Sequence, residues 1–315
     1  MTQIEGGGAD AARSPGTVVA LGADLIEQWP LPVDEGGDKH VRGTVLVVGG
    51  SPVTPGAVVL AGMAALRMGA GRLQIATAAG PALAVAVAVP EALVMPLTVD
   101  GDGFAAGAAD AAAELASRAD AVVIGPGMRG HEGAAGFIGT VLGAVQAGAV
   151  VVLDALAMQK VGELDRAVLA RLTGRIVLTP NRQELARLQD ANTGVRAETS
   201  GSGAESDEIL RTVAARYGAV ITSFGEIAAP DGRRWACREG TPGLGTSGSG
   251  DVLAGLVAGA AARSGDAAQA ACWGTYVHHA AGCRLSSRMG RLGFLARELL
   301  EEIPSLWADL ERRGA

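Results

Sequence analysis

The chain has 315 residues, 49% hydrophobic but only 3% aromatic, so its core must be built mainly from Ala, Val, Leu and Ile. Its 26 basic and 33 acidic residues give a net charge of −7, which lacks the basic excess of a nucleic-acid-binding protein. Cys237, Cys272 and Cys283 show no CxxC spacing and cannot all pair, which indicates free thiols and a cytoplasmic protein.

The N-terminal stretch predicts neither a signal peptide nor a membrane anchor. Residues 1–16 contain two acidic residues and no apolar run, so we expect a disordered tail followed by one domain over residues 17–315. Residues 133–153 are uncharged and reach the length of a spanning helix, about 20 residues. Their five glycines and their β-branched end before Asp154 instead favour a helix leading into a buried strand. We therefore expect no membrane association.

Several β-branched runs end in small or acidic residues and alternate with Ala-rich stretches of helical length, such as 56–71 and 110–119. The runs are 44–50, 72–77, 121–127, 150–155 and 175–181. This alternation predicts an α/β fold with a doubly wound, mostly parallel sheet and helices on both faces. Ligands bind such sheets at the carboxyl ends of the strands. The residues expected there are Gly49, Gly125, Gly127, Asp154 and Asn181.

A polar segment and a glycine-rich segment follow. Residues 190–207 are rich in Gly and Ser and predict a solvent loop or a lid.

Residues 243–255, "GLGTSGSGDVLAG", place flexible glycines before an apolar helical run, which suits an anion-binding site at a helix N-terminus. The segment is neither a Walker A motif nor a GxGxxG fingerprint. Its carboxylate, Asp251, has two interpretations: a general base for a hydroxyl that attacks phosphate, or a helix N-cap.

The order of motifs from about residue 39 to 304 resembles the ADP/ATP-dependent NAD(P)H-hydrate dehydratases of the ribokinase-like superfamily. The segments that carry the resemblance are 43–77, "PEAL" at 90–93, "VVIGPGM" at 122–128, "VVLDALAM" at 151–158, "LTPNRQELARL" at 178–188, "PGLGTSGSGDVLAG" at 242–255 and 276–304. The resemblance implies phosphorylation of the ring hydroxyl of hydrated NADH or NADPH from ADP or ATP, followed by loss of phosphate. It also implies a ribokinase-like fold, Mg²⁺ and a homo-oligomer.

The resemblance assigns site residues by position. It implies that Asp251 is the catalytic base and that Gly248, Ser249 and Gly250 form the anion hole. It places Ser223 at the nucleotide and Glu184 near Mg²⁺. Substrate contacts fall on Ala57, Gly127, Asn181 and Asp251.

Three departures from the family pattern bear on these assignments. Asn181 replaces a family histidine, and Leu156 stands where many members have a second Asp. Thr222, Ser223 and Phe224 occupy the place of a Lys-Gly pair, so a cation expected at the nucleotide is missing.

His278 and His279 lie in an expected helix without partners at the spacing of metal ligands, which favours a structural or surface role over metal binding.

Two alternatives stay open. Asn181 and Glu184 match the Asn-x-x-Glu of sugar kinases, which favours a ribokinase-like small-molecule kinase. The missing lysine and histidine favour a non-catalytic nucleotide-binding relative, although the retained GSGD loop argues against it. Relatives often carry an N-terminal epimerase domain, and about 40 residues precede the matching region here, so we expect any epimerase to be a separate chain.

Overall fold

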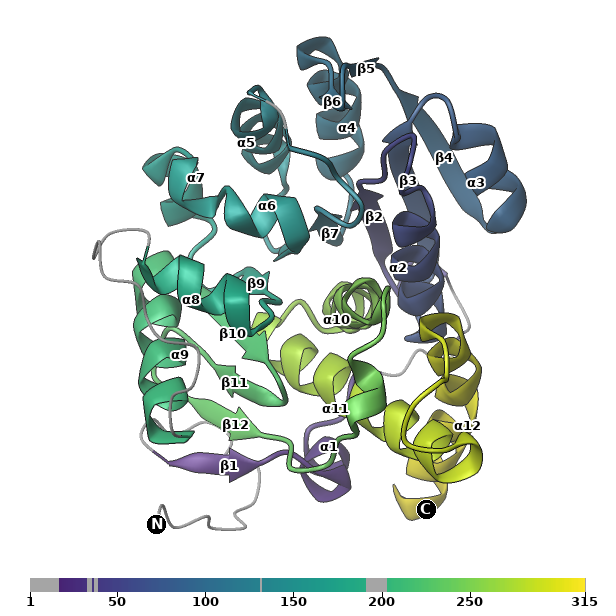
Figure 1. Ribbon diagram of the computed structural model, residues 1–315, viewed down its shortest axis with the longest axis vertical. Helices are drawn as coiled ribbons and strands as arrows, with labels where there is room; N and C mark the ends of the chain where they lie inside the picture. The colour runs from purple at the N-terminus through teal and green to yellow at the C-terminus, as the bar shows by residue number, and fades with distance from the viewer. Residues whose placement is uncertain (1–16, 33–35, 37–38, 131, 191–202, 315) are drawn as a thin grey trace.

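The computed structural model describes residues 17–32, 36, 39–130, 132–190 and 203–314 (Figure 1). The expected tail at 1–16 and most of the expected loop at 190–207 lie outside the described residues. The loop prediction was wrong at its C-terminal end, because helix α9 begins at Gly203. The Ser and Gly residues of this stretch concealed that helix start.

The described residues form a central ten-stranded sheet with the order β1-β12-β11-β10-β9-β8-β7-β2-β3-β4. All neighbouring strands are parallel except β11, which is antiparallel to both of its neighbours. The strands are β1 (Val18–Ala20), β2 (Thr44–Val48), β3 (Arg72–Ala78), β4 (Ala92–Leu97), β7 (Ala121–Ile124), β8 (Val150–Leu153), β9 (Ile176–Leu178), β10 (Ala219–Ser223), β11 (Glu226–Ala228) and β12 (Arg234–Ala236). Strands β5 (Val99–Asp100) and β6 (Gly103–Phe104) form a separate hairpin. The five runs identified in the sequence are β2, β3, β7, β8 and β9, which confirms the mostly parallel sheet.

Helices cover both faces of the sheet, as expected (Figure 1). One face carries α1 (Ala23–Gln28), α2 (Gly56–Arg67), α3 (Ala82–Ala88), α10 (Ser249–Ser264), α11 (Ala267–Met289) and α12 (Ala296–Gly314). The other carries α4 (Ala109–Ala116), α5 (Ala134–Ala144), α6 (Ala155–Gln159), α7 (Arg166–Arg171), α8 (Arg182–Asp190) and α9 (Gly203–Tyr217). Successive strand residues enter opposite cores: Val45 and Val47 pack on the first side, Leu46 and Val48 on the second.

The uncharged stretch 133–153 forms helix α5 and then the buried strand β8, as the sequence predicted. In the part of the chain that the structure describes, no helix combines the length and apolar character needed to cross a bilayer.

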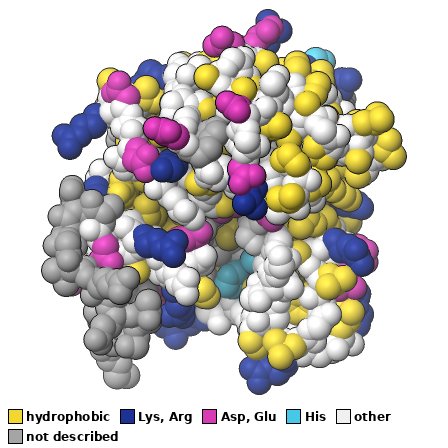
Figure 2. Space-filling model, turned by 45° about the horizontal axis from the view of Figure 1, so that its top comes forward, with side chains coloured by type: hydrophobic (Ala, Val, Ile, Leu, Met, Phe, Trp, Pro, Cys, Tyr) yellow, Lys and Arg dark blue, Asp and Glu magenta, His cyan; other side chains and the backbone are white. Residues whose placement is uncertain are grey.

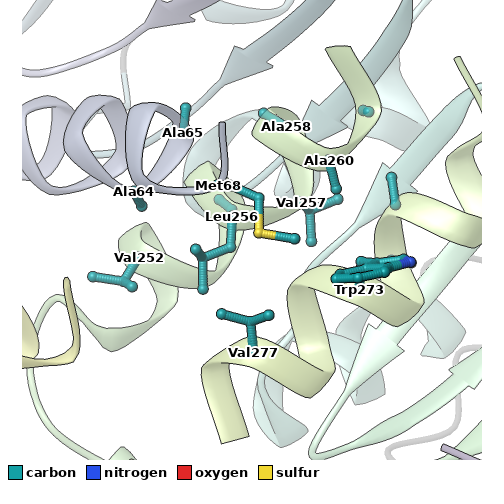
Figure 3. Close-up of a cluster of buried hydrophobic side chains, with 14 of the residues drawn as sticks. Ala64, Ala65, Met68, Val252, Leu256, Val257, Ala258, Ala260, Trp273 and Val277 are labelled. Atoms are coloured by element: carbon teal, nitrogen blue, oxygen red, sulfur yellow. The ribbon is translucent and has the colours of Figure 1, made fainter. Parts of the chain in front are cut away.

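Helix α10 lies at the centre of the first core, between α2 and α11 (Figure 3). Its approach to α2 depends on glycine, since a Cβ on Gly255 would lie 2.1 Å from the Ala61 carbonyl oxygen and one on Gly259 would lie 2.5 Å from that of Ala65. On the other side, Gly274 of α11 gives similar room to Val257. Backbone therefore packs directly on backbone, as an Ala/Gly-rich composition allows.

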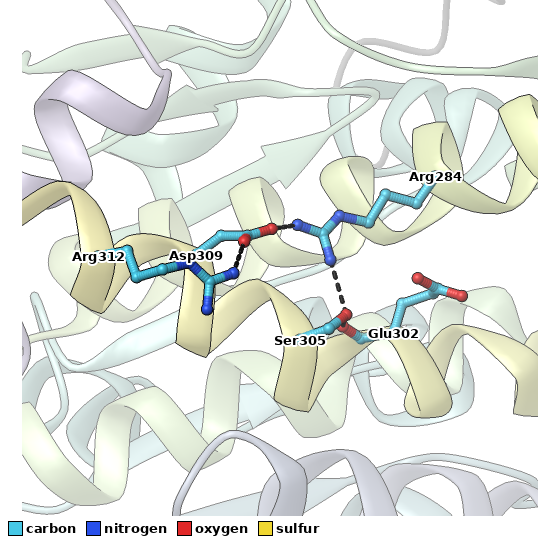
Figure 4. Close-up of polar contacts among 5 residues, drawn as sticks. All are labelled: Arg284, Glu302, Ser305, Asp309 and Arg312. Atoms are coloured by element: carbon cyan, nitrogen blue, oxygen red, sulfur yellow. Dashed lines mark hydrogen bonds and ion pairs between the residues drawn. The ribbon is translucent and has the colours of Figure 1, made fainter.

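Helix α12 is fastened to α11 by an ion-pair network (Figure 4). Arg284 of α11 pairs with Asp309 and donates to the Ser305 hydroxyl, while Arg312 pairs with the same Asp309 carboxylate. The N-terminal end of α12 reaches the glycine-rich segment before α10, where a Cβ on Gly248 would lie 3.2 Å from Ala296 Cβ. The helix that this network holds against α11 therefore lies, at its other end, beside the glycine-rich segment.

We predict that Gly255→Val destabilises the protein by about 2–4 kcal/mol, because the side chain meets rigid backbone that cannot shift cheaply. Urea denaturation followed by circular dichroism measures the change. The matched control is Gly136→Ala in the exposed part of α5, where a Cβ has no neighbour within 4 Å. This control should be neutral or gain up to about 1 kcal/mol, because Ala is the better helix former. A stable Gly255→Val protein would contradict the close packing.

Candidate active site

A cleft of about 730 Å³ opens at the carboxyl edge of the sheet, between the ends of β8, β9 and β10 and the start of α10. Figure 2 shows a hollow on the molecule with histidine at its bottom and charged side chains around it. The cleft wall includes Asn181, Glu184, Gly248, Ser249, Gly250 and Asp251, so it unites six of the residues selected from the sequence.

Helix α10 starts in the cleft without a side-chain cap. Its N-cap is Gly248, which has a positive φ of 88° that favours glycine, and no side chain accepts a hydrogen bond from the first turn. Asp251 is the third residue of the helix, so the N-cap interpretation of Asp251 was wrong. The Ser249 backbone N–H donates to the Thr246 carbonyl oxygen at 3.2 Å, whereas the N–H groups of Gly250 and Asp251 have no hydrogen-bond partner among the described residues. These two N–H groups remain available for an anion, next to the Asp251 carboxylate, which has no other hydrogen-bonding role in the described part of the chain.

The cleft holds two carboxylates with raised pKa values. Burial, and then the nearby charge of Asp154, raise the pKa of Asp251 to about 7. Burial is also the main cause that raises the pKa of Asp154 to about 6, with a smaller contribution from Glu184 and an opposing hydrogen bond from Thr179. Both carboxyl groups therefore titrate closer to neutral pH than an exposed aspartate does. A carboxylate with this pKa can take a proton from a hydroxyl group.

Asp154 was noted at a strand end but was not among the residues selected for the site. It is only 7% exposed, and the Thr179 hydroxyl donates to its Oδ1 at 2.7 Å. The next residue, Ala155, has a positive φ of 45°, a conformation that costs a non-glycine residue about 1–3 kcal/mol. A Cβ on Gly125 would lie 1.8 Å from the Asp154 carbonyl oxygen. Neighbouring strand ends thus fix this carboxylate, and only its position after "VVVL" pointed to it in the sequence.

Asn181 and Glu184 form a reciprocal capping box at the start of α8. The Glu184 backbone N–H donates to Asn181 Oδ1 and the Asn181 N–H donates to Glu184 Oε2, both at 3.0 Å. The Gln159 amide also donates to Glu184 Oε1 at 3.4 Å. The Asn-x-x-Glu spacing therefore has a structural explanation that needs no kinase.

Thr222, Ser223 and Phe224 stand in place of the family's Lys-Gly pair. Ser223 is buried, whereas Thr222 and Phe224 lie at the cleft. The Ser223 hydroxyl is buried and donates to the Pro180 carbonyl oxygen at 2.8 Å, so it links β10 to the turn before α8. Thr222 and Phe224 line the cleft. The Arg182 guanidinium lies 4.5 Å from the centre of the Phe224 ring, which brings a cation to the rim that sequence reasoning missed.

Ala57 and Gly127 form a second group of selected residues. A Cβ on Gly127 would lie 2.8 Å from Ala57 Cβ and 2.5 Å from the Thr54 carbonyl oxygen. The Thr54 hydroxyl donates to the Gly127 carbonyl oxygen at 2.8 Å, which joins the loop before α2 to the loop after β7. The two positions are therefore in contact with one another, but they are not part of the wall of the main cleft.

The neighbouring residues His278 and His279 of α11 both line the cleft. His278 Nε2 lies 2.9 Å from the Ser249 hydroxyl and 3.1 Å from the Ser249 carbonyl oxygen. Burial lowers the pKa of His278 to about 3, so its ring is neutral and supports the start of α10. The expected structural role is consistent with this contact.

The donor set at the cleft suits Mg²⁺ only through water or phosphate. Carboxylate oxygens of Asp154, Glu184 and Asp251 have the hard-ligand chemistry that Mg²⁺ prefers. Within the described ranges, however, no three His, Cys, Asp or Glu side chains are close enough together to hold an ion by themselves. An ion held by one or two carboxylates, waters and substrate phosphates fits this arrangement.

These features define an α/β protein with an uncapped helix N-terminus and a carboxylate of raised pKa at the carboxyl edge of a doubly wound sheet. The same fold occurs in a ribokinase-like superfamily protein from Enterococcus faecalis, with a TM-score of 0.72 and 20% identity over 92% of this chain and 95% of that one. The chain belongs to the NAD(P)H-hydrate dehydratase family, whose sequence profile it matches over residues 45–305.

Similar proteins include NAD(P)H-hydrate dehydratases, in agreement with this family assignment. The chain is 46% identical to an ADP-dependent (S)-NAD(P)H-hydrate dehydratase from Xanthomonas campestris, over 92% of this chain and 96% of that protein. A bifunctional NAD(P)H-hydrate repair enzyme from Moorella thermoacetica is 35% identical, but the alignment spans only 51% of its length. The ADP/ATP-dependent NAD(P)H-hydrate dehydratase of Bacillus subtilis, co-crystallised with ATP/Mg²⁺, has a TM-score of 0.75 and 27% identity over 93% of this chain and 99% of that one.

We predict that Asp251→Asn stabilises the protein at alkaline pH. Because the folded-state pKa of Asp251, about 7, lies above the unfolded value of 3.8, the folded protein binds the extra proton between these pH values and loses stability as pH rises through them. The variant should gain about 1–2 kcal/mol over the wild type at pH 8 and almost nothing at pH 4. Urea denaturation at both pH values measures the difference.

Asp110→Asn, which removes an exposed carboxylate from the first turn of α4, controls for the loss of a charge at a helix N-terminus. Equal stability of Asp251→Asn and wild type at pH 8 would contradict the desolvation of Asp251.

Proposed function

We propose that this protein restores NADH or NADPH from its hydrated form in an ADP- or ATP-dependent dehydration, which makes it a hydro-lyase of nicotinamide nucleotide repair. The observation that carries the proposal is the half-buried Asp251 beside the uncapped N-terminus of α10, inside the cleft. The close relation to the Xanthomonas dehydratase over nearly its whole length supports the same reaction.

In the first step, Asp251 takes the proton of the ring hydroxyl, and the hydroxyl oxygen attacks the terminal phosphoryl group of the nucleotide. The new O–P bond forms as the bond between that phosphorus and the bridging oxygen of the nucleotide breaks. We assign the transferring group to the glycine-rich turn of Gly248, Ser249 and Gly250. The Gly250 N–H and the helix dipole would stabilise its charge, because the Ser249 N–H already donates to the Thr246 carbonyl oxygen.

In the second step, phosphate leaves the ring carbon. The lone pair of the ring nitrogen expels it as the C–O bond breaks, and loss of a proton from the adjacent carbon completes the double bond. Phosphorylation makes this step feasible, because phosphate is a far better leaving group than hydroxide. We place the hydrated ring near Asp251, with Asn181, Ala57 and Gly127 as contacts, and the nucleotide towards Ser223 and its neighbours.

Mg²⁺ would neutralise charge on the nucleotide phosphates when bound. Glu184 is the residue we assign to it, through water, because its carboxylate lines the cleft while its oxygens also serve the capping box. Asp154 adds negative charge beside Asp251 and so favours a cation at this end of the cleft.

The structure bears on the two alternatives. The kinase interpretation rested on Asn181 and Glu184, and the capping box accounts for that pair without a sugar substrate. A non-catalytic protein has no need for a carboxylate that is desolvated in a cleft and has no other hydrogen-bonding role among the described residues. We therefore favour the dehydratase over both.

The setting of the enzyme is also a proposal. We propose a cytoplasmic homo-oligomer that works beside an epimerase carried by another chain. The three free cysteines support a reducing compartment. The bifunctional relatives, of which this chain spans about half, support a functional link to a second repair activity.

We predict that Glu184→Gln preserves the capping box at the start of α8 but weakens the proposed role of Glu184 in Mg²⁺ binding. Glutamine can still accept the Asn181 N–H, so the thermal midpoint should stay within about 2 °C of wild type. Loss of the charge should raise the Mg²⁺ concentration needed for half-maximal activity at least about 5-fold. Titration of activity with Mg²⁺ measures this, and an unchanged Mg²⁺ requirement would leave Glu184 as a helix cap only.

The first test of the function is incubation of pure protein with hydrated NADH, Mg²⁺ and either ADP or ATP, following the return of reduced-nicotinamide absorbance. Asp251→Asn should lower kcat at least about 10³-fold while nucleotide binding changes less than about 3-fold. In the wild type, kcat/KM should rise with pH up to about 7, as Asp251 loses its proton.

The outcomes separate the candidates. Recovery that depends on nucleotide and is lost in Asp251→Asn supports the dehydratase and identifies the preferred nucleotide. A folded wild-type protein that binds ADP but restores no NADH would point to a kinase for another substrate or to a binding protein.

A further inference from the structure

The His279 ring is held against one wall of the cleft by a defined hydrogen bond. Its Nδ1 lies 2.6 Å from the Glu239 carbonyl oxygen. The ring also lies against two glycines, because a Cβ would come within 3.0 Å of His279 Cε1 at Gly225 and within 3.3 Å of His279 Nδ1 at Gly240. The two glycines therefore leave the space that the ring fills, and the hydrogen bond to Glu239 orients it there.

This hydrogen bond determines the tautomer of His279. A carbonyl oxygen can only accept, so Nδ1 must carry the hydrogen. Burial lowers the pKa of His279, which keeps the ring neutral and leaves a lone pair on Nε2. Within the described residues no hydrogen bond engages Nε2. The cleft wall thus presents a fixed acceptor, which suits a ligand that offers an N–H or O–H group.

Phe224 presents an aromatic face to the same cleft. The residue is 60% exposed, and its φ of 50° is unusual and costly for a residue other than glycine. Arg182 covers the ring at 4.5 Å. An exposed ring held in a strained conformation at a cleft is a platform on which a planar base can stack, with about 1–3 kcal/mol per stacked base in comparable sites.

The two neighbouring histidines connect this aromatic region to the anion-binding helix start. His278 contacts Ser249, the first residue of α10, and the centres of the His278 and His279 rings lie 5.8 Å apart. Phe224, His279 and Ser249 all line the one cleft. A molecule with phosphates at α10 can therefore direct its base towards Phe224 and His279.

We propose that His279 selects the purine of the nucleotide by accepting a hydrogen bond from a 6-amino group at Nε2, while Phe224 stacks on the base. Adenine donates from this position, whereas hypoxanthine and guanine carry a 6-oxo group that would oppose the Nε2 lone pair. This inference rests on the proposed function for the presence of a purine nucleotide, and it adds the group that reads the base.

The test compares ADP and IDP by isothermal titration calorimetry with Mg²⁺ and without hydrated NADH. IDP has an oxo group in place of the 6-amino group and carries a hydrogen on N1, so it offers no donor at the 6-position. The wild type should bind ADP at least about 10-fold more tightly than IDP, because a hydrogen-bonding site rejects a mismatched group strongly. His279→Phe should weaken ADP binding about 10-fold and bring the ADP to IDP ratio close to one. His279→Gln, whose amide oxygen can replace Nε2 as acceptor, should keep part of the preference.

Phe224→Gly is the matched control for stacking. It removes the ring and also relieves the positive φ, so it should weaken both nucleotides by about the same factor and leave their ratio unchanged. Thermal unfolding verifies that each variant is folded, and His279→Gln serves as the test variant if His279→Phe is not.

The repair assay on the wild type shows whether a negative result contradicts the role of His279 alone or also the proposed function. Nucleotide-dependent repair with an unchanged ADP to IDP ratio in both His279 variants would overturn the role of His279 alone. Absence of binding of both ADP and ATP to the wild type would overturn the proposed function and this inference together.

Discussion

The close contact of α10 with α2 is the constraint on which the rest of the site depends. Gly255 and Gly259 allow the α10 backbone to lie against the carbonyl groups of Ala61 and Ala65. That contact carries the N-terminus of α10 down to the carboxyl edge of the sheet and leaves Asp251 half-buried beside Asp154. The close packing of the two helices thus determines how deeply Asp251 is buried, and burial is the main cause of its raised pKa.

This arrangement lowers the free energy of unfolding above neutral pH. Burial disfavours the charged forms of Asp154 and Asp251, and the strained backbone at Ala155 and Phe224 adds further cost. The large core on both faces of the sheet offsets these terms. In the proposed reaction this arrangement supplies a general base, because Asp251 is ionised just above neutral pH and lies at the start of a helix.

Sequence patterns located the fold and much of the cleft, because glycine-rich loops, strand ends and apolar runs are local signals. They could not separate the roles of Asn181 and Glu184, since a capping box and a metal-organising pair use the same residue types at the same spacing. Short strands such as β11 and β12 also gave little signal, because their three residues are ordered mainly by pairing with neighbours.

The sequence by itself determined the mostly parallel sheet, the glycine-rich start of α10 and the family, since each depends on composition or on residues close along the chain. Only the tertiary structure decided which groups meet across the cleft. Asp154 and Asp251 are 97 residues apart along the chain, and Phe224 and His279, which line the same cleft, are 55 residues apart. Their burial, pKa values and hydrogen-bond directions arise from packing between distant segments, which no local pattern encodes.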